Sequence, residues 1–361
     1  MKYEPIYYSE YLKLEDILGA QTLKSLEHGA EAHDETLFII IHQTYELWFK
    51  QILHEFNSIY DLFNETKVKP RNLGTINHRL GRIIEIQKVL NQQLNIIETM
   101  TPLDFMEFRD YLVPASGFQS IQFRQIELKM GLRQKYRLQA DKAFFNSRLE
   151  QKDKDLLIKM EEEPTFLELL DAWLARMPFA EMKGFNFWQE YQNIVNQMLD
   201  RDEEIIRSNQ TLSDKEKEFE LRNLNGTRMS FQILFDEKKY NELRSEGIVK
   251  LSREAKLSAI FIKLYRDEPI LQIPNRLLEL LIDMDEMFTT WRYRHAIMAH
   301  RMLGTKIGTG GSSGHEYLKK STENNRVFSD LFNLATYLIP IKNLPELPAE
   351  ISSSLGFNFE S

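Results

Sequence analysis

Two of the eight histidines lie on apolar helix faces, where an imidazole can do chemistry that a surface histidine cannot. His42 shares its face with Phe38, and His295 lies one turn from both Trp291 and Met298. Each is either a core imidazole held by a carbonyl or carboxylate, or a group that faces a shared cavity. Because the chain has no cysteine, a buried imidazole in a helical bundle suits an axial haem ligand, with the second imidazole as a distal polar group.

Other metal sites have weaker support in the sequence. The absence of cysteine excludes disulfides, cysteine zinc sites, iron–sulfur clusters and thiol nucleophiles. His33, Asp34 and Glu35 are adjacent, so on a helix their side chains point away from one another. His295 and His300 are five residues apart and diverge by about 140°. A non-haem metal centre is therefore the less natural interpretation.

Arg109 is a third candidate, since Phe105, Phe108 and Leu112 surround it in an otherwise apolar turn. A half-buried guanidinium favours a bidentate carboxylate partner. That partner is either a neighbouring aspartate, Asp104 or Asp110, or the carboxylate of a ligand. The pattern alone leaves both open.

The segment 308–314 contains four glycines in seven residues. It matches neither a phosphate-binding P-loop nor a dinucleotide fingerprint, because no Gly-Lys-Ser/Thr follows and no strand precedes it. It is either a flexible linker or a lid that orders over a ligand, with the Thr309 hydroxyl available for a contact.

The elements that must position these residues are helices. Apolar residues recur at steps of three and four over 36–62, 80–100 and 277–302. Asn225-Gly226 is a turn signal, and no stretch shows sustained strand alternation. Glycine (15) and proline (11) are scarce in 361 residues. We expect an all-α helical bundle, a single domain over 1–361 with an inserted helical subdomain at 140–260.

The composition limits the class of partner. The net charge of −8 gives no excess of positive charge of the kind that binds nucleic acid or an anionic membrane. The longest apolar run, 37–41, is far shorter than a membrane span. We expect a cytoplasmic protein with neither nucleic acid nor membrane as a partner.

Five blocks, taken together, resemble the tryptophan 2,3-dioxygenase family. They occur in the family's order and spacing from near residue 7 to about 340. The blocks are 8–12, 33–50, 108–120, 291–295 (Trp291-Arg292-Tyr293-Arg294-His295) and 308–314.

The resemblance implies a role for each matching position. His295 becomes the proximal haem ligand, and His42 the distal histidine that bonds the indole N–H. Arg109 pairs with the substrate carboxylate, and Thr309 contacts the amino-acid end of the substrate. Further residues are expected to line the substrate pocket: Phe38 against the indole ring, then Ile41, Leu112, Ser116 and Gly117, and from a neighbouring subunit Tyr8, Tyr11 and Leu12. The chain has Phe105 where some bacterial relatives carry tyrosine.

The resemblance also implies the activity. A family member uses ferrous haem b and O2 to cleave the indole C2=C3 bond of L-tryptophan, giving N-formylkynurenine in the first step of the kynurenine pathway. Family members are homotetramers. Two alternatives stay open at this point: a haem-based sensor on the same fold without turnover, and a helical scaffold with no cofactor.

Overall fold

The computed structural model describes residues 3–65, 68–136, 149–177, 181–182, 185–304, 322, 325–348, 351 and 355. The longer helices are α4 (His33–Phe63), α5 (Pro70–Ile97), α7 (Ile121–Met130), α9 (Gln151–Glu162), α10 (Phe166–Ala175), α11 (Phe187–Ser208), α12 (Asp214–Phe235), α13 (Glu237–Ser245), α14 (Arg253–Leu264) and α15 (Pro269–Leu303). The shorter elements are α1 (Tyr8–Leu12), α2 (Leu14–Leu18), α3 (Lys24–Glu27), α6 (Pro102–Met106), α17 (Ser329–Phe332), the 3-10 turns η1 (Arg109–Leu112), η2 (Gly117–Gln119), η3 (Gln134–Tyr136), η5 (Asn333–Tyr337) and η6 (Ile341–Asn343), and the strands β1 (Glu181–Met182) and β2 (Phe185–Asn186). The two strands form one short antiparallel pair, and the fold is all-α, as expected.

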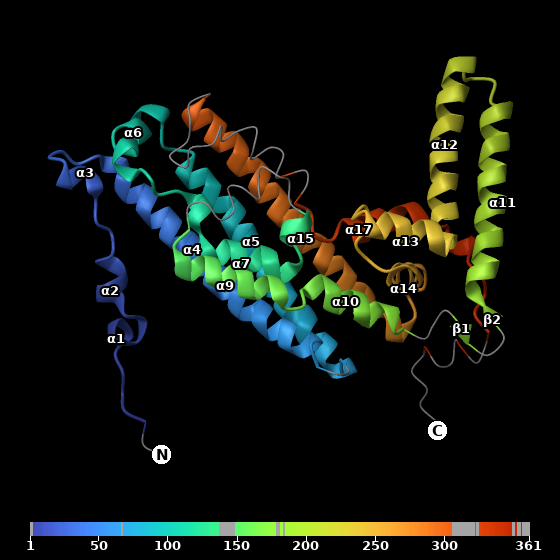
Figure 1. Ribbon diagram of the computed structural model, residues 1–361, viewed down its shortest axis with the longest axis horizontal. Helices are drawn as coiled ribbons and strands as arrows, with labels where there is room; N and C mark the ends of the chain where they lie inside the picture. The colour runs from blue at the N-terminus through green and yellow to red at the C-terminus, as the bar shows by residue number, and fades with distance from the viewer. Residues whose placement is uncertain are drawn as a thin grey trace.

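Three long helices, α4, α5 and α15, lie side by side along the molecule (Figure 1). α5 and α15 run parallel. The Asn77 side chain donates to the Ile273 carbonyl at 3.0 Å, and three turns further on Gln87 donates to the Met284 carbonyl at 3.0 Å. α4 runs antiparallel to both. These side-chain amides, one half-buried and one buried, are bonded to backbone carbonyls and fix the register between α5 and α15.

Backbone chemistry sets the limits of these helices. α5 and α15 each begin with a proline, Pro70 and Pro269, at the position where the missing N–H costs no hydrogen bond. Both therefore begin earlier than their apolar periodicity predicts. α15 ends at Gly304, which has φ 59° and ψ −128°, a conformation that only glycine adopts readily.

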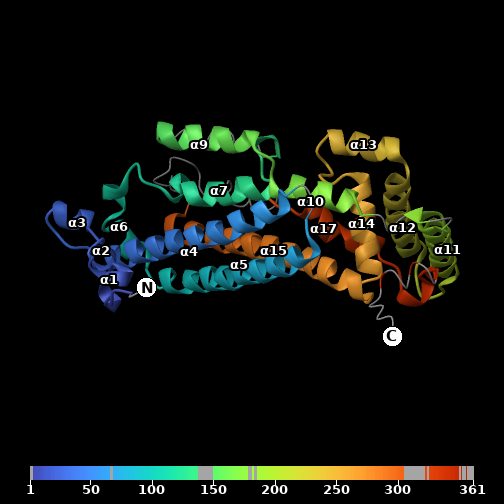
Figure 2. The ribbon, with the colours of Figure 1, turned by 90° about the horizontal axis from the view of Figure 1, so that it is seen from below.

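Two further helices cover one side of this three-helix body. α7 packs on α4, and α9 packs on α7, so that they form successive layers in Figure 2. α7 ends at Gly131, where φ is 137° and a Cβ atom would lie 2.8 Å from the Cβ of Leu167 in α10. Glycine at this position therefore allows α10 to pack closely against the end of α7.

The remaining helices extend the same core. One apolar cluster runs from α4, α5 and α15 into α10, α11, α12 and α14. α11 and α12 form a hairpin that stands at the far end of the molecule from the N-terminal helices (Figure 1). The inserted subdomain at 140–260 stays a prediction.

The expected turn at Asn225-Gly226 is wrong, because α12 continues through both residues. The helix is started by a capping box, in which Ser213 and Glu216 each accept a backbone N–H of the other. Burial of Phe231 further along also favours one continuous helix. These contributions outweigh the roughly 1 kcal/mol that an internal glycine costs a helix.

In the part of the chain described above, no helix combines the length and the apolar character needed to cross a membrane. The N-terminal helices α1 and α2 have no buried residue. They lie outside the three-helix body, at its end near the start of α4 (Figure 1).

Candidate functional site

The two histidines singled out from the sequence lie on facing stretches of α4 and α15. These helices meet where the Tyr45 ring packs edge-on against Trp291, with centroids 6.0 Å apart. The two helices are antiparallel. The residue one turn before Tyr45 in α4 therefore lies on the same side of this contact as the residue one turn after Trp291 in α15. These two residues are His42 and His295. The two imidazoles are close enough for charge on His42 to lower the pKa of His295.

His295 is a neutral imidazole under ordinary conditions. Its burial, with a smaller contribution from His42, lowers its pKa from 6.5 to about 4. Among the described residues, neither of its ring nitrogens makes a hydrogen bond. A neutral imidazole with an uncommitted lone pair is the form that binds a metal. The side chain therefore suits an axial haem ligand.

His42 has a defined tautomer. Its Nδ1 lies 2.7 Å from the carbonyl oxygen of Phe38, one turn earlier in α4, so Nδ1–H donates and Nε2 keeps its lone pair. The residue is exposed, yet enough protein surrounds the imidazole for desolvation to lower its pKa. The bond to Phe38 and the charge of Glu46 oppose that shift. His42 therefore presents a hydrogen-bond acceptor.

Glu46 is a site residue that the sequence analysis missed. It lies one turn after His42, and Gln122 of α7 donates to its carboxylate at 2.8 Å and to its backbone carbonyl at 2.9 Å. Its negative charge favours protonation of His42. A carboxylate four residues after a histidine on one helix face was a signal available in the sequence.

Aromatic rings enclose one side of His42. Phe38 lies 4.1 Å from the imidazole centroid, and it packs on Phe105 at 5.7 Å and on Phe108 at 5.5 Å. Leu37, Leu112 and Met302 join the same apolar cluster. The cluster brings α4, α6, η1 and the end of α15 together. It forms an apolar wall of tilted and edge-on rings on the side of His42 that Phe38 covers.

Arg109 begins η1, directly after the fully buried Phe108. Asp104, one of its two expected aspartate partners, is engaged elsewhere: it accepts the N–H of Thr101 at 2.8 Å and caps α6. This bonding lowers the pKa of Asp104. A pair with Asp110 stays an alternative. Arg109 is half-buried, on the turn that carries Phe108 into the aromatic wall.

The other expected pocket residues differ in their surroundings. Ser116 accepts the Phe118 N–H at 3.4 Å and starts η2, where Gly117 is exposed. Ile41 is buried in the main core beside His42. Thr309 and the rest of the glycine-rich loop 308–314 lie outside the described residues.

The N-terminal candidates are not assembled with His42 by their own chain. Tyr8 is 74% exposed and Tyr11 is 72% exposed, both on α1, and Leu12 is half-buried. The following segment is tied to α4, since Gln21 donates to the Gln43 side chain at 2.7 Å. This bond holds the N-terminal segment beside the turn that contains His42.

Glu35 has a structural role. The carboxylate is buried and accepts the N–H groups of Lys24 and Ser25 at 2.8 and 3.0 Å, which ties α3 to α4. No group of three or more histidine and acidic side chains in the described ranges could hold a metal ion.

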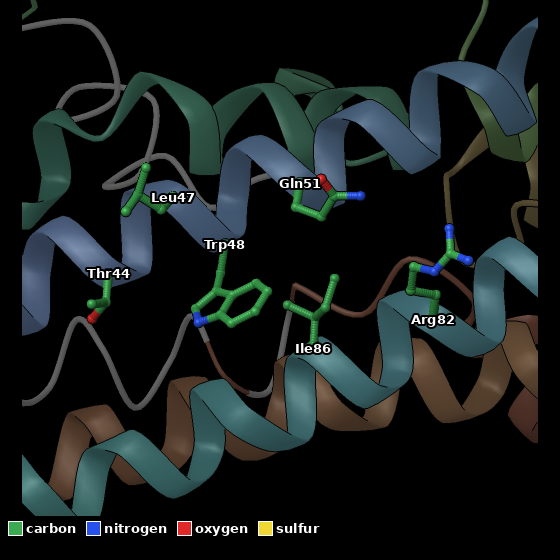
Figure 3. Close-up of a pocket in the computed structure, with 6 residues that line it drawn as sticks. All are labelled: Thr44, Leu47, Trp48, Gln51, Arg82 and Ile86. Carbon is green, nitrogen blue, oxygen red and sulfur yellow. The ribbon is translucent and has the colours of Figure 1, made fainter. Parts of the chain in front are cut away.

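A groove of about 570 Å³ lies between α4 and α5, with Trp48 and Ile86 at its centre and Arg82 at one end (Figure 3). Thr44, at its other end, follows His42 by two residues, which is about 200° around the helix. The groove therefore faces away from His42 and does not belong to the candidate site.

Comparison with known proteins identifies the family to which this chain belongs. The family model described as tryptophan 2,3-dioxygenase matches residues 2–338. A tryptophan 2,3-dioxygenase of Alteromonas mediterranea is 52% identical over 98% of this chain and 98% of its own length. The enzyme of that name from Bdellovibrio bacteriovorus is 47% identical over 99% of this chain and 100% of its own. The mouse enzyme is 44% identical over 95% of this chain and 84% of its own.

Proposed function

Because the chain belongs to the tryptophan 2,3-dioxygenase family, we propose that the residues between α4 and α15 form its active site. The protein is an enzyme that cleaves the indole C2=C3 bond of tryptophan with O2 and produces N-formylkynurenine. The proposal concerns which side chains perform this reaction. Its main support is the placement of His42 and His295 on facing stretches of two antiparallel helices.

Haem b fits the residues on the α15 side. His295 is neutral and uses neither ring nitrogen in a hydrogen bond among the described residues, which leaves a nitrogen for an axial bond. Met298 follows one turn later, and Met302 belongs to the apolar cluster beside it. When bound as ferrous haem, the cofactor supplies the centre at which O2 is activated.

Side chains of α4 suit the indole ring of the substrate. Nε2 of His42 accepts the indole N–H, because Nδ1–H is committed to the Phe38 carbonyl. Phe38, packed at a 36° tilt on the same imidazole, offers its ring to the indole. Ile41 and Leu112 add apolar contacts. His42 orients the substrate and can hold its proton at Nε2.

The amino-acid end of L-tryptophan needs charged and polar partners. Arg109 pairs with the carboxylate through two parallel N–H donors. Thr309 contacts the amino-acid end, and Ser116 and Gly117 border it. A site built to pair both ends of a zwitterion rejects indoles that lack the carboxylate, because the guanidinium would then be left without its partner.

A homotetramer completes the proposed site. Tyr8 and Tyr11 expose most of their surface, and no residue of α1 is buried in its own chain. We infer that Tyr8, Tyr11 and Leu12 contact the substrate pocket of a neighbouring copy. Light scattering on the Tyr8→Ser/Tyr11→Ser variant tests this: dissociation, or a raised KM for tryptophan, supports it. An intact tetramer with an unchanged KM contradicts it.

Haem loading tests the ligand assignment. His295→Ala should lose stable haem and its Soret band, whereas His54→Ala, which removes an exposed histidine of α4, should keep both. Full haem occupancy in His295→Ala contradicts the assignment. No finding favours a haem sensor, which would bind haem but leave tryptophan uncleaved. A cytoplasmic location stays a prediction of the sequence.

A further inference from the structure

The Trp291 indole lies parallel to the His295 imidazole. Their planes differ by 3°, and their centroids are 5.2 Å apart. The two residues are four apart on α15, so one turn of helix places the indole against one side of the imidazole. No other aromatic ring in the described part of the chain stacks on His295.

In the described part of the chain, His295 has no hydrogen-bond acceptor of the kind that usually holds a ligand ring. A metal-bound histidine normally donates its second N–H to a carboxylate or a carbonyl, and this bond sets the rotation of the ring. Among the described residues, no such acceptor reaches His295. Within the described residues, ring packing is the contact that can set the orientation of the imidazole plane.

Trp291 is itself held on several sides. Tyr45 and Phe49 of α4 meet it edge-on, with centroids at 6.0 and 6.5 Å, and Phe123 of α7 lies at 5.1 Å. The Tyr45 hydroxyl donates to the Leu90 carbonyl of α5 at 2.8 Å, which fixes that ring in turn. Contacts from α4 and α7 thus fix the orientation of the Trp291 indole. A fixed indole can orient the His295 imidazole that stacks on it.

We propose that Trp291 is a positioning residue that sets the rotation of the His295 imidazole about its bond to the haem iron. The inference rests on the proposed axial role of His295. A stacked indole orients the ligand without accepting its proton or placing a negative charge beside it. The imidazole therefore stays neutral, and a neutral ligand favours the ferrous iron that the reaction needs more than an imidazolate-like one does.

The test compares Trp291→Leu and Trp291→Phe with Phe56→Leu, all as haem-loaded enzyme. Phe56→Leu is the matched control, because Phe56 is a buried aromatic residue of α4 whose ring packs on Phe166 and, among the described ring contacts, on neither Trp291 nor His295. Two readouts report the ligand: the spread of electron paramagnetic resonance g values in the ferric cyanide complex, and the iron–histidine stretching frequency in the ferrous form. The rate of haem transfer to excess apomyoglobin is measured beside them.

Trp291→Leu should change both spectra and release haem roughly 2- to 12-fold faster, from the usual strength of an aromatic pair. Trp291→Phe should lie between it and the wild type, and Phe56→Leu should match the wild-type spectra. Wild-type spectra in Trp291→Leu would overturn the inference. Circular dichroism shows whether Trp291→Leu folds. If it does not fold, the same two spectra of Trp291→Phe are compared with those of the wild type instead.

His295→Ala separates this inference from the proposed function. Loss of haem in His295→Ala with unchanged spectra in Trp291→Leu refutes only the positioning role. Normal haem binding by His295→Ala refutes the axial assignment, and with it the premise of the inference.

Discussion

Replacing Arg292 with methionine should destabilise the protein strongly, because it breaks a buried ion pair one turn before His295. Arg292 Nη2 lies 2.7 Å from Glu127 Oε1, and the two side chains are only 7% and 8% exposed. The pair joins α15 to α7. Arg292 also donates to the carbonyl of Asn325 at 3.2 Å. Methionine fills much of the same volume, but it removes the positive charge that lies 2.7 Å from the buried Glu127 carboxylate.

Removing one partner of a buried pair costs about 3–5 kcal/mol, since the remaining charge is desolvated and uncompensated. For a chain of this size each kcal/mol lowers the melting temperature by roughly 1.3 °C, so Arg292→Met should melt about 4–7 °C lower. Glu127→Met added to it should recover much of the loss, because the buried carboxylate that lost this cation is then also removed. Lys88→Met is the control. Its pair with Glu85 is exposed, and such pairs contribute about 0–1 kcal/mol.

Thermal unfolding of the haem-loaded enzyme at neutral pH, followed by circular dichroism, measures these differences. A melting temperature of Arg292→Met within two degrees or so of Lys88→Met would refute the reasoning. A double variant less stable than Arg292→Met would refute the argument that loss of the cation beside the buried carboxylate causes the destabilisation.

Arg109→Ala should raise the KM for tryptophan roughly 30-fold or more, from about 2–5 kcal/mol for a truncated charge pair, and leave the Soret band in place; an unchanged KM would contradict the carboxylate role. Because the pKa of His42 is lowered, kcat/KM should stay level above pH 6.5 and fall only below it, where Nε2 becomes protonated and can no longer accept the indole N–H. A pH–rate profile with its acid limb centred above 6.5 would exclude this. In haem-free protein the melting temperature should fall as the pH decreases from 6.5 to about 4. In this range His295 binds a proton in the unfolded chain but not in the folded protein, because folding lowers its pKa. Calorimetry of His295→Phe should show a smaller fall.

The helices that carry the site were predictable because their apolar periodicity is long and regular. His42 and His295 were each identified by an apolar face interrupted by a single imidazole, and both helices are present. The helix starts at Pro70 and Pro269 were missed, because their first turns are polar or carry prolines that apolar spacing does not register.

The relation between the two histidines was not predictable from periodicity. It depends on the register of α4 against α15, which the Tyr45–Trp291 contact sets across 246 positions of the chain. The parallel stack of Trp291 on His295 also needs side-chain rotamers, which spacing does not supply. Asn225-Gly226 failed as a turn signal because helix capping and burial outweighed a local preference.

The measurement that tests the central claim most directly is turnover by the dithionite-reduced, haem-loaded enzyme, followed through the near-ultraviolet absorbance of N-formylkynurenine. Our account predicts product that requires both O2 and L-tryptophan, and its loss in His295→Ala but not in His54→Ala. A strong Soret band without product, or undiminished product from His295→Ala, would contradict it.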